Sequence, residues 1–276
     1  MVAINLRKQG FEGSISIVTD ESNYPYQRPP LSKGFLTGKT NTESLFFKGQ
    51  DYYKKNGIKV LLKHSAIRLD TKKQEVILQD GSNLDYKKLV ITTGSKLNKI
   101  TSKEHKKIIY LNTLSKAVDL QKLLKGNQSV GIVGAGYIGL EVAATAIKMG
   151  LQTTVLEAEK RIMQRSASKE ISNFIKNYHE KMGVEFKLKA IAEKIEPTDK
   201  GVNISVKDGD DTNTDFLLIG VGVQAASAIA EDAGIDCSNG ILVDENCQTN
   251  DKNIYAAGDC VNYYFSRYGT RHRLES

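Results

Sequence analysis

The sequence has few of the residues that build metal sites, disulfide frameworks or membrane segments. Its 276 residues include three cysteines, none of them before Cys237, and four scattered histidines. The cysteine spacing fits neither a disulfide framework nor a zinc site, so we expect reduced thiols, no metal and a cytoplasmic location. No apolar run approaches the length of a transmembrane helix, and the first residues lack the apolar region of a signal peptide. We therefore expect neither a membrane span nor secretion.

Positive charge is concentrated in one stretch. The formal net charge is +7, and residues 85–125 hold ten lysines against three acidic residues, a balance equal to the whole net charge. Such a stretch can steer acidic partners or anionic cofactors, although a solvated lysine-rich surface is the commoner reason for the pattern. Basic residues do not alternate with aromatic ones as they do in nucleic-acid grooves, so we expect no nucleic-acid partner.

The most informative stretch is a glycine fingerprint near the middle of the chain. An apolar run over residues 129–133 predicts a buried parallel strand, and a helical pattern follows as far as residue 149. Between them, Gly134, Gly136 and Gly139 form G-x-G-x-x-G. In a dinucleotide site these glycines permit the tight turn, the approach of backbone to a pyrophosphate, and close packing of helix on strand. The helix N-terminus adds N–H donors and a partial positive charge.

Glu157 indicates which dinucleotide binds. It ends the next predicted strand, residues 153–156, about 20 residues after the fingerprint, as expected for the acid that accepts hydrogen bonds from the adenosine ribose. A carboxylate there repels a 2′-phosphate and favours NAD over NADP. Lys160 and Arg161 follow closely and could receive such a phosphate, so NADP is the alternative.

The chain opens with a second partial signature. Residues 2–9 have a helical pattern that ends at Gly10, and a short strand over residues 14–18 leads to Asp20 and Glu21. Helix, glycine, strand and acid form the second half of a nucleotide-binding βαβ unit. We expect its first strand and glycine loop to precede Met1 in a longer natural chain.

A proline-rich segment follows, with three of the four prolines of the chain in residues 24–33. Prolines this dense predict a rigid, non-helical segment with Ser32 as the N-cap of a short helix. Such a segment could place Arg28 and Lys33 at a functional site, or be an ordinary surface turn.

The remaining periodicity alternates strands with helices. Helices are predicted over residues 114–124 and 169–181. Strands are predicted over residues 57–62, 65–70, 74–79, 89–93, 184–188, 191–196, 202–207, 216–223, 241–243 and 254–257.

Together these segments resemble the two-dinucleotide flavoprotein reductases, and among them the NADH-dependent ferredoxin reductases that serve oxygenase systems. The most specific matching stretches are residues 28–33, 136–144, 219–222 and 258–260. The resemblance implies an α/β fold with two Rossmann-like dinucleotide-binding domains, as in glutathione reductase. The FAD domain would be discontinuous, with segments 1–110 and 225–276, both incomplete, on either side of an NAD domain at 111–224.

The resemblance also implies roles for individual residues. Lys33 would be the lysine on the flavin side, paired with Glu141, and these two are the expected catalytic residues. The expected FAD-binding residues are Asp20, Arg28, Lys33, Ile67, Thr93, Gly94 and Asp259. The expected NAD-binding residues are Gly134, Gly136, Ile138, Gly139, Glu157 and Gly222.

The implied activity is electron transfer from NADH through FAD to a ferredoxin-type [2Fe-2S] protein of an oxygenase system. A disulfide reductase needs a redox thiol pair in the first FAD segment, and residues 1–236 contain no cysteine. The alternative from another class is a truncated, non-catalytic NAD-binding remnant that no longer holds FAD.

Overall fold

A computed structural model describes residues 1–273, and the chain divides into two compact units. The fingerprint unit comprises Gln27–Leu45 and Leu97–Gly222 and contains the glycine fingerprint. The outer-segment unit comprises Met1–Tyr26, Phe46–Lys96 and Val223–Ser276. The last three residues of the predicted FAD segment 225–276 lie outside the described part of the chain.

The compact units differ from the predicted domain boundaries around the proline-rich segment. The sequence prediction assigns residues 27–45 and 97–110 to the first FAD segment, whereas both pack within the fingerprint unit. The 3₁₀ helix η1 (Pro29–Ser32) contacts α4 (Leu114–Gly126) and α5 (Tyr137–Lys148). The side chain of Gln121 in α4 also donates a 2.6 Å hydrogen bond to the carbonyl of Phe35. These contacts attach the proline-rich segment to the fingerprint unit.

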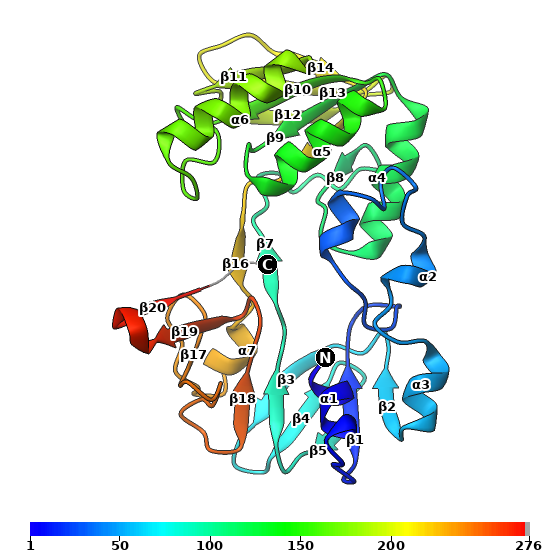
Figure 1. Ribbon diagram of the computed structural model, residues 1–276, viewed down its shortest axis with the longest axis vertical. Helices are drawn as coiled ribbons and strands as arrows, with labels where there is room; N and C mark the ends of the chain where they lie inside the picture. Colours follow the sequence, from blue (N-terminus) through cyan, green and yellow to red (C-terminus); the bar gives the residue numbers. More distant parts are fainter. Residues whose placement is uncertain (274–276) are drawn as a thin grey trace. The chain divides into compact units, whose positions relative to one another are not determined.

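With α4 and α5, the other elements of the fingerprint unit alternate between strand and helix from β8 to β11 and are strands from there to β15 (Figure 1). They are α2 (Thr42–Leu45), β8 (Ile108–Ile109), β9 (Ser129–Val133), β10 (Gln152–Glu157), α6 (Lys169–Lys181), β11 (Val184–Leu188), β12 (Ala192–Pro197), β13 (Val202–Val206), β14 (Thr212–Thr214) and β15 (Phe216–Ile219).

Five of these strands form a parallel sheet in the order β11-β10-β9-β15-β8. Helix α5 contacts β9, β10 and β11, while β14 of the antiparallel sheet β12-β13-β14 contacts β9. A strand that is covered on both faces reads as a continuous apolar run, which explains the sequences of β9 and β15. Ile195 and Ile204 of the antiparallel sheet pack with Leu156 and Leu217 of the parallel one.

The outer-segment unit is built from smaller pieces of sheet. Its helices are α1 (Val2–Lys8), α3 (Gln50–Lys55), α7 (Ala228–Glu231) and the 3₁₀ helix η2 (Ser266–Tyr268). Its strands are β1 (Ile15–Val18), β2 (Ile58–Leu61), β3 (Ala66–Asp70), β4 (Glu75–Leu78), β5 (Asn83–Asp85), β6 (Leu89–Ile91), β16 (Val223–Ala225), β17 (Ile241–Val243), β18 (Ile254–Ala256), β19 (Val261–Phe265) and β20 (Thr270–His272). Strand β7 (Ser95–Leu97), which pairs with β16, spans the boundary between the units.

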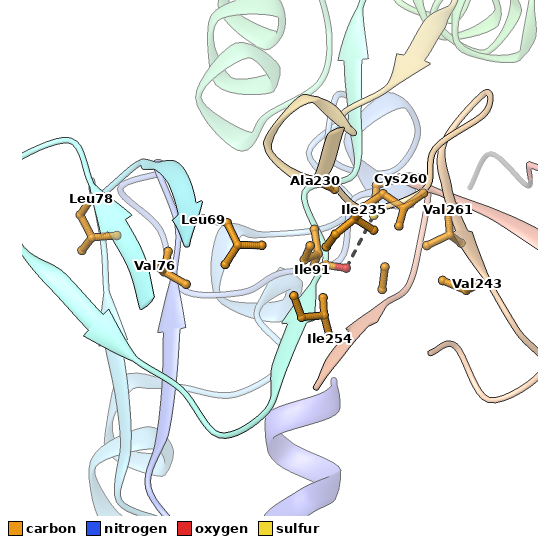
Figure 2. Packing of buried hydrophobic residues seen from close by; sticks show 12 residues of the cluster. Leu69, Val76, Leu78, Ile91, Ala230, Ile235, Val243, Ile254, Cys260 and Val261 are labelled. Carbon is orange, nitrogen blue, oxygen red and sulfur yellow. Dashed lines mark hydrogen bonds between the residues drawn. The ribbon is translucent and has the colours of Figure 1, made fainter. Parts of the chain in front are cut away.

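Three strand pairs of this unit are parallel: β1 with β2, β6 with β18, and β17 with β19. The second pair joins segments from opposite ends of the sequence, with Ala256 beside Ile91. Figure 2 shows the buried cluster around this pair, in which Ile91 and Ile254 pack with Ile235 and Val261. The thiol of Cys260 donates to the carbonyl of Ile91 at 3.6 Å, and the thiol is fully buried. The core of this unit thus depends on contacts between distant segments.

Most long elements match the sequence predictions, but two predictions are wrong: the strand over residues 216–223 and the role of Ser32 as an N-cap. Helix α6 and strand β11 have the predicted bounds. The predicted strand 216–223 is interrupted, because Gly222 has a φ of +91° and the strand ends at Ile219. Ser32 is not the N-cap of a following helix. It ends η1, and its hydroxyl donates to Glu141 instead.

Candidate dinucleotide site

The glycine loop between β9 and α5 requires glycine at two positions for steric reasons. Gly134 has a φ of +103°, and a Cβ on it would lie 2.3 Å from the carbonyl oxygen of Gly220. A Cβ on Gly139 would lie 2.1 Å from the carbonyl oxygen of Gly134. Both distances are far shorter than van der Waals contact with backbone, so these glycines allow the loop, β15 and α5 to approach one another.

Gly136 differs, because the space beside it is open. A Cβ on Gly136 would meet no heavy atom within 4 Å, and its φ of −83° suits any residue. Gly136 is the N-cap of α5, and Tyr137 and Ile138 in the first turn are 59% and 39% exposed. The free N–H groups of this turn therefore face a space that can admit an anion, which is the geometry that binds a pyrophosphate.

Glu157 lies at the end of β10 and holds the glycine loop. Its Oε2 accepts a 2.7 Å hydrogen bond from the backbone N–H of Ala135, and its Oε1 accepts one of 2.9 Å from the N–H of Glu159. Each carboxylate oxygen has further lone pairs, so ribose hydroxyls can be bound by the same fixed carboxylate. Glu157 thus has a structural contact in addition to the predicted one.

The two cations that follow Glu157 have different surroundings. Lys160 is exposed. Arg161 is half-buried, and its guanidinium donates to the carbonyls of Gln164 and Ala167 at 2.9 and 2.7 Å. Arg161 is therefore engaged with the loop that follows β10, which the sequence alone did not indicate.

Gly222 follows β15, in the same unit. Its carbonyl accepts a 3.1 Å hydrogen bond from the backbone N–H of Asn98, and the side chain of Asn98 donates to the carbonyl of Val221 at 3.3 Å. A Cβ on Gly222 would lie 3.9 Å from Nη1 of Arg165. The positive φ of Gly222 thus shapes the turn that leaves the parallel sheet.

Lys33 and Glu141 form the predicted ion pair. The Nζ of Lys33 lies 3.0 Å from Oε2 of Glu141, with the side chains 53% and 31% exposed. Lys33 also donates to the carbonyl of Pro29 at 3.1 Å. Both partners belong to the fingerprint unit, whereas the family resemblance places them in different domains.

Ser32 completes this cluster and was missed as a site residue. It is 7% exposed, and its hydroxyl donates a 2.5 Å hydrogen bond to Oε2 of Glu141, the oxygen that Lys33 contacts. The side chain of Arg28, at the start of the same segment, donates to the carbonyl of Asn112. The proline-fixed backbone of residues 28–33 therefore places three functional side chains, and the proline density of the sequence was the signal for this rigid segment.

In the outer-segment unit, the parallel pair β6 and β18 brings predicted FAD residues together. Thr93 and Gly94 follow β6, and Asp259 follows β18, so they leave the same edge of that pair. The hydroxyl of Thr93 donates to the carbonyl of Ala226 at 2.6 Å, and the N–H of Ala226 donates to the carbonyl of Gly94 at 3.0 Å. The carboxyl edge of parallel strands is where α/β folds bind dinucleotides, so these residues fit an FAD site.

The two other predicted FAD residues of this unit are exposed. Asp20 lies just beyond the carboxyl end of β1, beside the parallel strand β2. Ile67 lies on β3 at a register shift between Ala66 and Arg68, and 56% of it is exposed. An exposed carboxylate beyond a parallel strand fits the ribose of a dinucleotide, and irregular backbone can offer its N–H or carbonyl group to an adenine.

The cysteines lack the features of a redox pair. All three are free, and burial raises the pKa of the Cys237 thiol to about 11, with the nearby Glu231 carboxylate adding to the effect. Reactive thiols have lowered pKa values, so Cys237 is poorly suited to thiolate chemistry. Within residues 1–273, no cluster of three or more His, Cys, Asp or Glu is arranged to hold a metal ion, and no helix is long and apolar enough to cross a membrane.

The glycine loop, the uncapped helix and the fixed acid define a Rossmann-type dinucleotide-binding protein. The model of the pyridine nucleotide-disulphide oxidoreductase family matches residues 1–274. The chain is 35% identical over 274 residues to a rubredoxin-NAD(+) reductase from Pseudomonas putida, covering 98% of this chain and 71% of the relative. It is 33% identical over 283 residues to putidaredoxin reductase from Pseudomonas putida, covering 100% and 67%.

A solved structure agrees with these sequence relatives. The reductase chain in a crystal structure of a covalent putidaredoxin reductase–putidaredoxin complex superposes with a TM-score of 0.95 and 33% identity, covering 100% of this chain and 68% of that one. The chain therefore belongs to the pyridine nucleotide-disulphide oxidoreductase family. The predicted fold class, α/β with two Rossmann-like dinucleotide-binding domains, is confirmed by this match.

Proposed function

We propose that the protein is an FAD-dependent oxidoreductase that passes electrons from NADH to a small ferredoxin-type [2Fe-2S] protein. The observation that carries this proposal is the fixed glycine loop with Glu157, in a chain whose relatives are named as reductases of rubredoxin and putidaredoxin. The fingerprint unit contains the proposed NAD-binding residues, and the outer-segment unit contains the proposed FAD-binding residues Asp20, Ile67, Thr93, Gly94 and Asp259. An oxygenase system is the expected consumer of the electrons.

The NAD-binding residues have distinct tasks. Gly136 leaves space for the pyrophosphate at the N-terminus of α5, and Gly134 and Gly139 keep the loop close to the sheet. Glu157 accepts hydrogen bonds from the adenosine ribose and repels a 2′-phosphate. Ile138 in the first turn of α5 and Gly222 after β15 line the rest of the coenzyme. NADH is therefore the preferred donor.

The FAD-binding residues that we propose are Asp20, Arg28, Lys33, Ile67, Thr93, Gly94 and Asp259. The support for Thr93, Gly94 and Asp259 is their shared position at the carboxyl edge of β6 and β18. FAD held by these residues would supply the redox chemistry that links the two-electron donor NADH to a one-electron acceptor.

Lys33 and Glu141 are the proposed catalytic residues. The ammonium of Lys33 favours the negative charge that arrives with a hydride, as preorganised donors do in oxyanion sites. Glu141 neutralises Lys33 in the resting protein, and the hydroxyl of Ser32 fixes the carboxylate oxygen that Lys33 contacts. Since Ser32 is buried, this hydrogen bond restricts the carboxylate to one orientation.

Charge and thiol chemistry support the proposed partner and location. All but one of the ten lysines in residues 85–125 are exposed, which suits long-range attraction of an acidic iron–sulfur protein. Thiol-based disulfide reduction is disfavoured by the raised pKa of Cys237. Free thiols also suit a reducing compartment, and we place the reaction in the cytoplasm.

The proposal is tested by purifying the chain with excess FAD and measuring NADH-driven reduction of a [2Fe-2S] ferredoxin by its visible spectrum. We expect a yellow protein and ferredoxin reduction that depends on both FAD and NADH. A colourless protein that binds NADH and transfers no electrons would instead support the second candidate, a non-catalytic NAD-binding remnant.

A further inference from the structure

Arg161 forms a closed network with the loop between β10 and α6. Its Nη2 donates to the carbonyl of Gln164 at 2.9 Å. Its Nη1 donates to the carbonyl of Ala167 at 2.7 Å and to the hydroxyl of Ser172 at 2.6 Å. Ser172 is 1% exposed and donates in turn to the carbonyl of Ile162 at 2.8 Å. One guanidinium thus satisfies polar groups along the whole loop.

This network braces a residue with an unfavourable backbone conformation. Met163 has a φ of +50° and is 8% exposed, although the left-handed region is sterically unfavourable for a non-glycine residue. Its backbone N–H donates a 3.0 Å hydrogen bond to the carbonyl of Ala135 in the glycine loop. The conformation of Met163 must therefore be maintained by its surroundings, and the bonds from Arg161, which precedes Met163, to Gln164 and Ala167, which follow it, span this residue.

Ala135 is consequently held at both of its backbone groups. Glu157 accepts from its N–H, and Met163 donates to its carbonyl. The two contacts come from opposite ends of a seven-residue stretch, Glu157 to Met163, that contains Arg161. Any loosening of residues 162–168 would therefore release Met163 from Ala135 and leave Glu157 as the remaining contact to that residue.

We propose that Arg161 is a positioning residue that sets coenzyme preference, by bracing the loop that holds Glu157 and the glycine loop together. This inference rests on the proposed NADH-binding function of the site. It differs from the role that the sequence suggests for Arg161, which is a cation for a 2′-phosphate. A guanidinium that donates to two carbonyls and a buried hydroxyl acts on the loop, and it acts on the coenzyme only through Glu157.

The test uses the whole chain and two coenzymes, NADH and NADPH, titrated separately by nicotinamide fluorescence. Arg161→Met removes the donors and keeps the length of the side chain, and Arg161→Lys keeps the positive charge but not the planar fork. Lys169→Met is the matched control, because it removes one exposed positive charge at the first residue of α6. Hydrogen exchange at the amides of Ala135 and Met163 reports the state of the loop without any coenzyme.

We expect Arg161→Met to weaken NADH binding about tenfold, the effect of losing a charge-assisted hydrogen bond, while NADPH binding changes little. The preference for NADH should narrow by the same factor, and both amides should exchange faster. Arg161→Lys should behave in the same direction, because an ammonium cannot reproduce the fork. Lys169→Met should match the unmodified protein in all of these measurements.

Three results would overturn the inference. The first is selective loss of NADPH binding in Arg161→Met with full retention in Arg161→Lys, which would make Arg161 a phosphate ligand. The second is a lowered melting temperature with an unchanged preference, which would leave a purely structural brace. The third is unchanged binding and exchange in both variants. Failure of the unmodified chain to bind either coenzyme would refute the proposed function as well, which separates the two failures.

Discussion

The two compact units build their candidate sites in opposite ways. In the fingerprint unit, one continuous stretch from β9 to α6 supplies the glycine loop, the anion-binding helix end, Glu157 and Arg161. In the outer-segment unit, Thr93 and Gly94 leave the same sheet edge as Asp259 only because β6 pairs with β18, more than 160 residues along the chain. A local site depends on backbone geometry over a few residues, whereas the second site depends on distant segments packing correctly around Ile91 and Cys260 (Figure 2).

This contrast predicts that small changes in the glycine loop have large and separable effects. Gly134→Ala adds a Cβ 2.3 Å from the Gly220 carbonyl at a φ of +103°. We expect it to lower the free energy of unfolding by about 3 kcal/mol, through strain and overpacking. Gly136→Ala adds a Cβ in open space and should change stability by less than about 0.5 kcal/mol, yet abolish NADH binding. Thermal unfolding and NADH titration of both variants check this pair.

Each of these two glycine variants serves as the control for the other, because both add one methyl group to the same loop. Equal destabilisation by Gly134→Ala and Gly136→Ala would mean that the loop has no open face. Retained NADH affinity in Gly136→Ala would mean that the pyrophosphate does not approach this glycine.

Removal of Lys33 should mainly affect hydride transfer. Lys33→Ala leaves Glu141 with the hydrogen bond from buried Ser32, so the carboxylate stays in place but unneutralised. We expect the barrier to flavin reduction by NADH to rise by about 2–4 kcal/mol while NADH binding changes little. Stopped-flow reduction of the FAD-loaded protein measures the rate. An unchanged rate would mean that the Lys33–Glu141 ion pair has only a structural role.

A smaller effect is expected at Ser32. Ser32→Ala removes one hydrogen bond to Glu141 without changing charge, and should raise the same barrier by about 1 kcal/mol. Ser44→Ala, which alters an exposed hydroxyl that donates to the carbonyl of Asn41, serves as its control. If both variants reduce flavin at the unmodified rate, Ser32 does not orient the carboxylate.

The smallest effect is expected for the cysteines of the outer-segment unit. Replacing Cys237, Cys247 and Cys260 together by serine should leave ferredoxin reduction unchanged, and near-complete loss with flavin still bound would contradict thiol-free turnover. Because the pKa of Cys237 is raised to about 11, the folded protein holds its thiol proton longer than the unfolded chain does. Its contribution to stability is therefore complete below about pH 9 and lost as the pH rises toward 11. Alkylation of Cys237 at pH 9 should likewise be slower in the folded than in the unfolded protein.

The sequence predicted local features of the fingerprint unit better than contacts between distant segments of the outer-segment unit. The β9–α5–β10 unit and Glu157 were predicted because glycine spacing and apolar runs are local signals. The contacts of Ser32 and Arg161 were not predicted, because the identity of a serine or an arginine does not reveal whether its side chain faces solvent or a buried partner. Short strands such as β8 and β14 were also not predicted, since two or three residues are too few to show the alternation of apolar and polar side chains that identifies a strand. The pairing of β6 with β18 was not predicted, because nothing local to either strand encodes its partner. The family resemblance implied only that segments 1–110 and 225–276 share one domain.

NADH is the proposed hydride donor of this site, and Glu157 is the residue proposed to select it over NADPH. The decisive measurement is anaerobic titration of the FAD-loaded chain with NADH and, separately, with NADPH, followed by bleaching of the flavin absorbance. We predict that NADH bleaches the flavin at lower concentration and faster than NADPH, and that Glu157→Ala narrows the difference. Equal or better reduction by NADPH in the unmodified protein would contradict the account.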